Sequence, residues 1–325
     1  MKKSRKLATL GICSALFLGL AACQQQYATS EGTNQKQSSS AKVPWKASYT
    51  NLNNQVSTEE VKSLLSAHLD PNSVDAFFNL VNDYNTIVGS TGLSGDFTSF
   101  THTEYDVEKI SHLWNQKKGD FVGTNCRINS YCLLKNSVTI PKLEKNDQLL
   151  FLDNDAIDKG KVFDSQDKEE FDILFSRVPT EATTDVKVHA EKMETFFSQF
   201  QFNEKARMLS VVLHDNLDGE YLFVGHVGVL VPADDGFLFV EKLTFEEPYQ
   251  AIKFASKEDC YKYLGTKYAD YTGEGLAKPF IMDNDKWVIS IVNSQKPRKN
   301  ETFIGYIQRY DIDGNGYQSL PCPQN

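Results

Sequence analysis

The fold is decided by residues 221–245, which have the sequence YLFVGHVGVLVPADDGFLFVEKLTF. A continuous apolar run before Pro232 and an alternating run after Gly236 predict two strands, and the polar loop between them predicts an antiparallel hairpin. A helix is expected at 256–271, because Ser256 is a good N-cap and acidic residues follow in the first turn. Further strands are predicted at 208–213, 251–254, 287–292 and 302–310.

The half of the chain before Lys205 has helical periodicity, and a capping box at Ser57 opens its first helix. Residues 89–101 are expected as a loop, and the acid-rich residues 147–158 as a solvated loop. Helices are predicted at 57–69, 71–88, 104–116, 167–177 and 185–202. Helices first and mostly antiparallel strands afterwards define an α+β fold, which we expect as a single domain over residues 43–325.

Residues 1–22 have the features of a lipoprotein signal peptide. Four basic side chains precede an apolar stretch, residues 7–20, that is too short to span a membrane stably. The stretch ends in Leu20-Ala21-Ala22-Cys23, which matches the lipobox of bacterial lipoproteins. We therefore expect a diacylated Cys23 to anchor the protein on the extracytoplasmic face of the cell membrane. The alternative is that Cys13 and Cys23 are ordinary buried cysteines of an N-terminal helix.

The composition past the lipobox limits the possible partners. Residues 23–42 are almost free of apolar side chains and predict a flexible tether. Without residues 1–22 the chain has 30 Lys and Arg against 43 Asp and Glu, a formal charge of −13, which argues against nucleic acid as a partner. No cofactor is indicated. The histidines show no ligand spacing, and residues 311–322 lack the final Glu of a calcium loop, so no metal site is predicted.

One cysteine has a sequence environment typical of a reactive thiol. Asn125 is a good N-cap, so Cys126 falls in the first turn of a helix, where the helix dipole and unpaired backbone N–H groups favour the thiolate. The alternative is a small buried side chain, the usual fate of a free cysteine. Cys132 lies too far along the same helix to be its disulfide partner and is expected in the core. The pairing of Cys260 and Cys322 is left open.

His226 and Glu241 are the candidates for partners of this thiol. Gly225 and Gly228 beside His226 are expected to leave room for another side chain or a substrate. If the hairpin loop spans residues 232–235, His226 lies directly opposite Glu241. If a tight turn forms at residues 235–236 instead, the two are about 13 Å apart along the strands. His226 can also be an ordinary, hydrogen-bonded core residue.

The order thiol, imidazole, carboxylate is the order needed for an activated cysteine nucleophile. The segments Thr124-Asn125-Cys126-Arg127 and His226-Val227-Gly228-Val229 resemble the nucleophile helix and the histidine strand of NlpC-type, papain-like cell-wall cysteine hydrolases. The region from about Tyr49 onward also resembles an uncharacterised family of lipoproteins from Gram-positive bacteria. The resemblance implies a papain-like core over about residues 104–310, with a peptidoglycan peptide as substrate.

The same resemblance implies a role for each candidate residue. Cys126 would be the nucleophile, His226 the base, and Glu241 the orienting residue, where members of the group usually have His, Asn or Gln. The backbone N–H of Cys126, positioned by the Asn125 cap, would help to hold the oxyanion. The insert between Cys126 and His226 would form a lid or a specificity wall. A non-catalytic lipoprotein that binds a ligand or partner on the same scaffold is the competing hypothesis.

Overall fold

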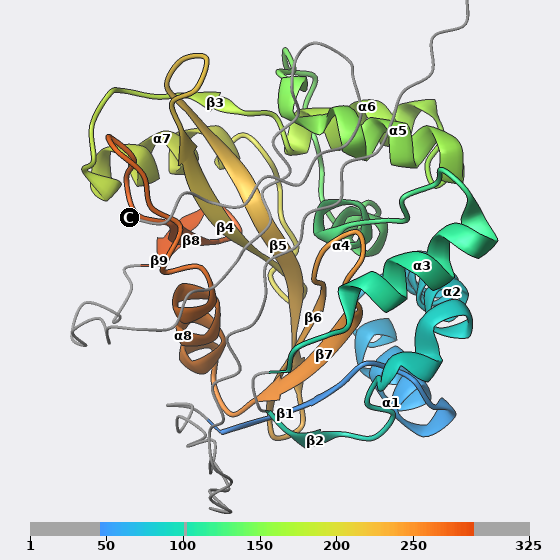
Figure 1. Ribbon diagram of the computed structural model, residues 1–325. Coiled ribbons are helices and arrows are strands. Elements are labelled where there is room, and N and C mark those ends of the chain that lie inside the picture. The colour runs from blue at the N-terminus through green and yellow to red at the C-terminus, as the bar shows by residue number, and fades with distance from the viewer. Residues whose placement is uncertain (1–45, 101–102, 289–325) are drawn as a thin grey trace, which may run out of the picture. The chain divides into compact units, whose positions relative to one another are not determined.

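The computed structural model describes residues 46–100 and 103–288 (Figure 1). As predicted, most helices lie before Lys205 and most strands after it, but the short strands at residues 47–50, 98–99 and 178–179 were not predicted. The helices are α1 (Gln55–Ser66), α2 (Pro71–Val88), α3 (Val107–Lys118), α4 (Cys126–Leu134), α5 (Phe151–Gly160), α6 (Ser165–Leu174), α7 (Val186–Phe197) and α8 (Lys257–Lys267). The strands are β1 (Ala47–Thr50), β2 (Thr98–Ser99), β3 (Val178–Pro179), β4 (Arg207–Asp215), β5 (Tyr221–Ala233), β6 (Gly236–Lys242), β7 (Tyr249–Phe254), β8 (Phe280–Asp283) and β9 (Lys286–Val288). The α+β class is confirmed.

The described strands form one antiparallel sheet in the order β2-β1-β7-β6-β5-β4-β8-β9, and β3 pairs with the start of β5. One face of the sheet packs against α1 to α7 in the larger hydrophobic cluster, and the other face packs against α8 in the smaller one. Figure 1 shows α8 separated by the sheet from α2, α3 and α4. The two strands of the opening sequence, β5 and β6, therefore lie in the middle of the sheet.

Local capping signals predict several helix ends, with one exception. The α2 helix begins at Pro71 because the Asp70 side chain accepts from the backbone N–H groups of residues 72 and 73. The capping box predicted at Ser57 is wrong. The side chain of Asn54 caps α1 instead, accepting from the N–H of Ser57 at 2.9 Å, so the helix begins two residues earlier than predicted.

The acid-rich segment 147–158 is not a solvated loop. A helical turn at residues 148–150 leads into α5, and the side chain of Asp153 in its first turn is fully buried. Burial of this carboxylate is stabilised by ionic hydrogen bonds to Arg127 of α4. Charge composition alone did not reveal this partner, which lies 26 residues earlier in the chain.

The register of the β5–β6 hairpin differs from both predicted registers. The turn is formed by Asp234 and Asp235, and Ala233 pairs with Gly236. The ladder continues to this two-residue turn, the shortest common hairpin connection, so β5 and β6 are longer at this end than a four-residue loop allows. Extension of the Val229–Val240 pair by one residue places Glu241 across from Gly228, diagonal to His226.

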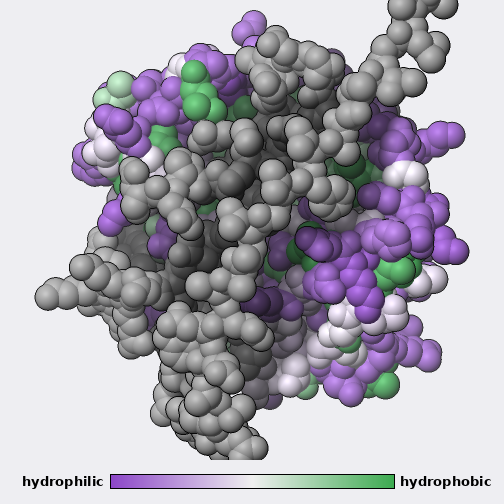
Figure 2. Space-filling model, in the orientation of Figure 1, coloured by the Kyte–Doolittle hydropathy of each residue, from purple (hydrophilic) through white to green (hydrophobic). Residues whose placement is uncertain are grey.

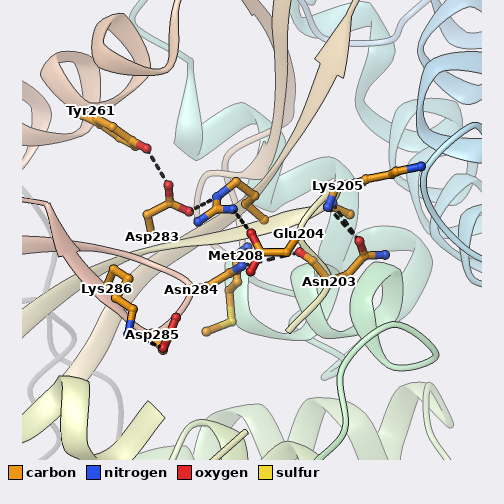
Figure 3. Close-up of polar contacts among 11 residues, drawn as sticks. Asn203, Glu204, Lys205, Met208, Tyr261, Asp283, Asn284, Asp285 and Lys286 are labelled. Carbon is orange, nitrogen blue, oxygen red and sulfur yellow. Dashed lines mark hydrogen bonds and ion pairs between the residues drawn. The ribbon is translucent and has the colours of Figure 1, made fainter. Parts of the chain in front are cut away.

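A polar cluster attaches the β8–β9 hairpin to the rest of the sheet (Figure 3). Asn284 in the hairpin turn makes two hydrogen bonds of 2.8 Å with the backbone of Met208 in β4. Its side-chain oxygen accepts from the N–H of Met208, and its own N–H donates to the carbonyl of Met208. The carboxylate of Asp283 accepts from the guanidinium of Arg207 and, at 2.5 Å, from the hydroxyl of Tyr261 on α8. The cluster therefore joins the sheet edge to the helix that covers it.

The described surface visible in Figure 2 is mainly hydrophilic, with small hydrophobic patches between polar side chains. Large exposed apolar side chains among the described residues are Val56, Phe151 and Leu217, which lie in separate elements or loops. Single exposed apolar residues are normal on a folded protein and do not define a docking surface.

Gly228 is a position where added volume is expected to destabilise the sheet. A methyl group there would overlap the ring of Phe239 and lie 2.8 Å from the carbonyl oxygen of Val240. Because both neighbours are buried, we expect Gly228→Ala to lower the free energy of unfolding by roughly 1–3 kcal/mol. Urea unfolding followed by circular dichroism measures this loss. An unchanged midpoint with an unchanged slope would show that the Phe239 ring moves away freely.

Candidate active site

The site is built where one edge of β5 has no neighbouring strand. β4 pairs with one edge of β5 along residues 221–230. On the other edge β6 pairs with residues 229–233 and β3 with residues 221–222. Among the described strands none pairs with residues 223–228 on this second edge, and His226 lies in that gap. A bulge in the β4–β5 ladder at Gly225 adds to the irregularity.

The start of α4 fills the gap and satisfies its backbone groups. Arg127 Nη1 donates to the carbonyl of Val224 at 3.0 Å, and Ser130 Oγ donates to the carbonyl of Val227 at 3.2 Å. These two carbonyls flank His226, so side chains replace the missing strand on both sides of the imidazole. Figure 1 shows α4 beside β5, viewed nearly along its axis.

Asn125 caps α4 as predicted, and Cys126 is the first helical residue. The Asn125 side chain accepts from the N–H of Ile128 at 3.1 Å. A second network holds the preceding backbone: Asn129 Nδ2 donates to the carbonyl of Asn125 at 2.8 Å and to Thr124 Oγ1 at 2.9 Å. The nucleophile candidate therefore has a fixed backbone at a positive helix end.

The thiol of Cys126 and the imidazole of His226 are electrostatically coupled, and each shifts the pKa of the other. Nε2 of His226 is bound to Glu241, which leaves Nδ1 as the ring nitrogen for a second partner. Burial raises the pKa of Cys126, but the charge and hydrogen bond of His226 outweigh it, and the pKa lies below its ordinary value of 9.0. Burial lowers the pKa of His226, but Cys126 and Glu241 outweigh it, and the pKa lies above 6.5. Both shifts favour a thiolate–imidazolium pair.

Glu241 completes the line behind the imidazole. Its Oε2 accepts from His226 Nε2 at 2.5 Å, and its Oε1 accepts from the hydroxyl of Tyr263 and lies 3.5 Å from Lys267 Nζ. The Glu241 side chain is 0 % exposed. Burial raises its pKa, but Lys267, His226 and Tyr263 together lower it to about 2, so Glu241 is ionised at neutral pH.

The diagonal register explains how Glu241 reaches His226. Side chains diagonal to one another across an antiparallel pair are within reach when one is long. Gly228 follows the last printed pair of the β5–β6 ladder, Val229 with Val240, and has no side chain to block the diagonal. The predicted room at the two glycines is taken up by other side chains of the sheet, Phe239 at Gly228 and Leu213 at Gly225. The ring of Tyr268 stacks on His226 with 5.0 Å between ring centroids.

Cys132 is the internal contrast to Cys126 on the same helix. It is buried in the core, as predicted, and burial raises the pKa of its thiol to about 12. Cys126, Cys132 and Cys260 are free thiols, and Cys322 lies outside the described residues. The pKa values of two buried cysteines six residues apart are therefore shifted in opposite directions, because an imidazole acts on only one of them.

Four residues of the site were not predicted from the sequence. Tyr263, Lys267 and Tyr268 approach from α8, and Arg127 approaches from the nucleophile helix itself. The α8 helix was predicted, and its stripe of Tyr263 and Lys267 four residues apart was visible in the sequence, but nothing local indicates that this stripe faces Glu241.

Two further findings concern the described residues alone. No group of three His, Cys, Asp or Glu side chains in residues 46–100 and 103–288 has the arrangement of a metal site. In the same ranges no helix has both the length and the hydropathy needed to cross a bilayer. Cys23, the lipobox and the tether lie outside the described residues.

The fold and the site define an α+β protein with an aligned cysteine, histidine and glutamate in its centre. Residues 48–288 match the model of a family described as "Domain of unknown function (DUF4300)", and the chain belongs to this family. The match includes all three of these residues. No curated protein and no solved structure matches the chain.

Proposed function

We propose that this protein is a lipoprotein, anchored through Cys23 on the outer face of the cell membrane, and a cysteine hydrolase of papain-like, NlpC-type fold. Its substrate would be an amide bond of a cell-wall peptide. The observation that carries the proposal is the line from the Cys126 thiol through the imidazole of His226 to the buried carboxylate of Glu241. The lipobox and the two short motifs supply the location and the substrate class.

The proposed reaction is acyl transfer through a thioester. The Cys126 thiolate attacks the amide carbonyl, and the oxyanion accepts a hydrogen bond from the backbone N–H of Cys126. The C–N bond breaks as the imidazolium of His226 gives its proton to the leaving amine. His226 then takes a proton from water, whose oxygen attacks the thioester. The C–S bond breaks, which releases a carboxylic acid and restores the thiolate and imidazolium.

Glu241 acts through His226 in this scheme. Its negative charge stabilises the imidazolium and holds the ring with Nδ1 toward the sulfur. Lys267 and Tyr263 keep the carboxylate ionised in a buried site, so it remains an acceptor throughout the reaction. The stronger acceptor, compared with a neutral Asn or Gln, favours the charged pair before substrate arrives.

A second candidate function is non-catalytic binding on the same scaffold. The observation that favours it is the low exposure of the reactive groups, 5 % for Cys126 and 1 % for His226. A hydrolase must bring a carbonyl carbon to the sulfur, whereas a binding protein has no such requirement. Reactivity of the thiol separates the two.

The test is alkylation of the full-length protein with iodoacetamide across pH, followed by mass spectrometry. Trypsin cleaves after Arg127 and separates Cys126 from Cys132, so Cys132 is an internal control in every sample. We expect Cys126 to react at neutral pH and Cys132 to stay unmodified, because their thiol pKa values are shifted in opposite directions.

His226→Ala is the matching variant for this experiment. Without the imidazole, burial is the largest influence left on the pKa of the thiol and raises it, so we expect alkylation at neutral pH to fall by on the order of tenfold or more. Its reactivity should then rise only above about pH 9. A Cys126 thiol that reacts no faster than Cys132, and ignores the loss of His226, would leave only the binding hypothesis.

A further inference from the structure

Asp153 of α5 contacts both chain neighbours of Cys126. Its Oδ1 accepts from Asn125 Nδ2 at 2.7 Å and from Arg127 Nε at 2.9 Å, and its Oδ2 accepts from Arg127 Nη2 at 2.6 Å. The carboxylate is 0 % exposed and forms a bidentate pair with the guanidinium. One buried anion therefore fixes the residue before the nucleophile and the residue after it.

The same link continues from Arg127 to the histidine strand. Arg127 Nη1 donates to the carbonyl of Val224, two residues before His226 and next to the bulge at Gly225. Asp153, Arg127 and the β5 backbone thus form one continuous chain of hydrogen bonds around the thiol. It spans α5, α4 and the open edge of β5, the elements whose spacing sets the distance from sulfur to imidazole.

We infer that Asp153 and Arg127 are positioning residues that hold Cys126 at the reacting distance from His226. This inference rests on the proposed function and adds two residues to its site. The guanidinium reaches a carbonyl of β5 only from one orientation, and the bidentate carboxylate fixes that orientation. The two charges act on the thiol in opposite directions, since Arg127 lowers the pKa of Cys126 and Asp153 raises it.

A neutral side chain at position 153 or a non-planar one at position 127 cannot hold this arrangement of hydrogen bonds. Asparagine at position 153 has one acceptor oxygen, whereas Asn125 and Arg127 present three N–H donors to the carboxylate. In Asp153→Asn the new amide N–H₂ group would face one of these donors, and Arg127 would lose the negative charge that pairs with it. Lysine at position 127 keeps the charge but has no planar group to bridge Asp153 and Val224 at once.

The chain offers a matched control in the cluster of Figure 3. Asp283 is also buried and also pairs with one arginine, Arg207, while its second oxygen accepts from Tyr261. Asp283→Asn therefore removes the same chemistry from the β4–β8 edge of the sheet, away from α4. Both aspartate variants are expected to unfold at lower urea concentrations than the wild type.

The experiment compares alkylation of Cys126 in the full-length protein with Asp153→Asn, Arg127→Lys and Asp283→Asn, across pH. We expect Asp153→Asn to slow the reaction at neutral pH by on the order of tenfold and to move its pH midpoint upward, because the thiol loses contact with the imidazole. Arg127→Lys should give a smaller change in the same direction, and it provides the test if Asp153→Asn does not fold. Asp283→Asn should leave both the rate and the midpoint at the wild-type values.

The outcomes separate this inference from the proposed function. If the wild-type thiol is activated, and Asp153→Asn and Arg127→Lys both keep the wild-type alkylation rate and pH midpoint, the inference is overturned and the proposed function stands. Equal effects of Asp283→Asn and Asp153→Asn also overturn it, because general destabilisation then explains the loss. A wild-type Cys126 no more reactive than Cys132 removes the proposed function and this inference with it.

Discussion

Replacing Cys126 with serine is expected to abolish the proposed hydrolysis of cell-wall peptide amides, with a loss on the order of 10⁴-fold or more. The imidazole of His226 is matched to a thiol whose pKa is lowered, and it is too weak a base to keep a serine hydroxyl ionised. Release of new amino groups from purified peptidoglycan fragments, followed by mass spectrometry, measures the loss.

Cys132→Ser is the control for this prediction. It makes the same sulfur-to-oxygen change on the same helix, but the thiol of Cys132 is buried in the core and no imidazole acts on it. We expect normal hydrolysis and a modest loss of stability. A thioester adduct on the tryptic peptide that ends at Arg127, seen in the wild type and absent in Cys126→Ser, would show the intermediate directly. Equal hydrolysis by wild type and Cys126→Ser would contradict the mechanism.

Local signals in the sequence predicted the parts of the site that a few neighbouring residues determine. The cap at Asn125 and the position of Cys126 in the first turn depend on one short segment, and both are confirmed. The strands around His226 and Glu241 follow from apolar runs and are also confirmed. Such signals are reliable because the backbone and side-chain groups involved lie within four residues of one another.

Signals that depend on pairing between distant segments were less reliable. Both proposed hairpin registers are wrong, and the actual turn at Asp234 and Asp235 places His226 and Glu241 on a diagonal. The side chains still meet because Glu241 is long and Gly228 is small. The contact was one of two alternatives, and the register from which it was derived is wrong, because the sequence did not distinguish registers one or two residues apart.

Partners from other elements were beyond sequence reasoning. Asp153 lies in a segment whose composition favours a solvated loop, yet it is buried, and the partly buried Arg127 of another helix compensates its charge. Lys267 and Tyr263 reach Glu241 only because α8 packs on that face of the sheet. A buried charge in each case is stable only with its partner, and the partner is set by tertiary packing.

Replacing Glu241 with glutamine is expected to disable the thiol and to destabilise the fold together. The imidazolium loses its anion, so the pKa of His226 falls and the pKa of Cys126 rises, and alkylation at neutral pH drops by on the order of tenfold or more. Breaking a buried ion pair leaves Lys267 without its charge partner, which costs roughly 3–5 kcal/mol of unfolding free energy at neutral pH. Alkylation and urea unfolding measure the two effects.

Acid titration tests the stability part of this prediction by its sign. The pKa of Glu241 is about 2 in the folded protein and near 4.5 when the chain unfolds, so its stabilisation is complete above about pH 4.5 and disappears as the pH falls toward 2. The gap between wild type and Glu241→Gln should therefore close over that interval. Glu220→Gln is the control, because Glu220 also binds a buried histidine, His214, at 2.6 Å, but neither of these residues is among the groups that shift the pKa of Cys126. If it slows alkylation of Cys126 as much as Glu241→Gln does, the carboxylate behind His226 has no special role.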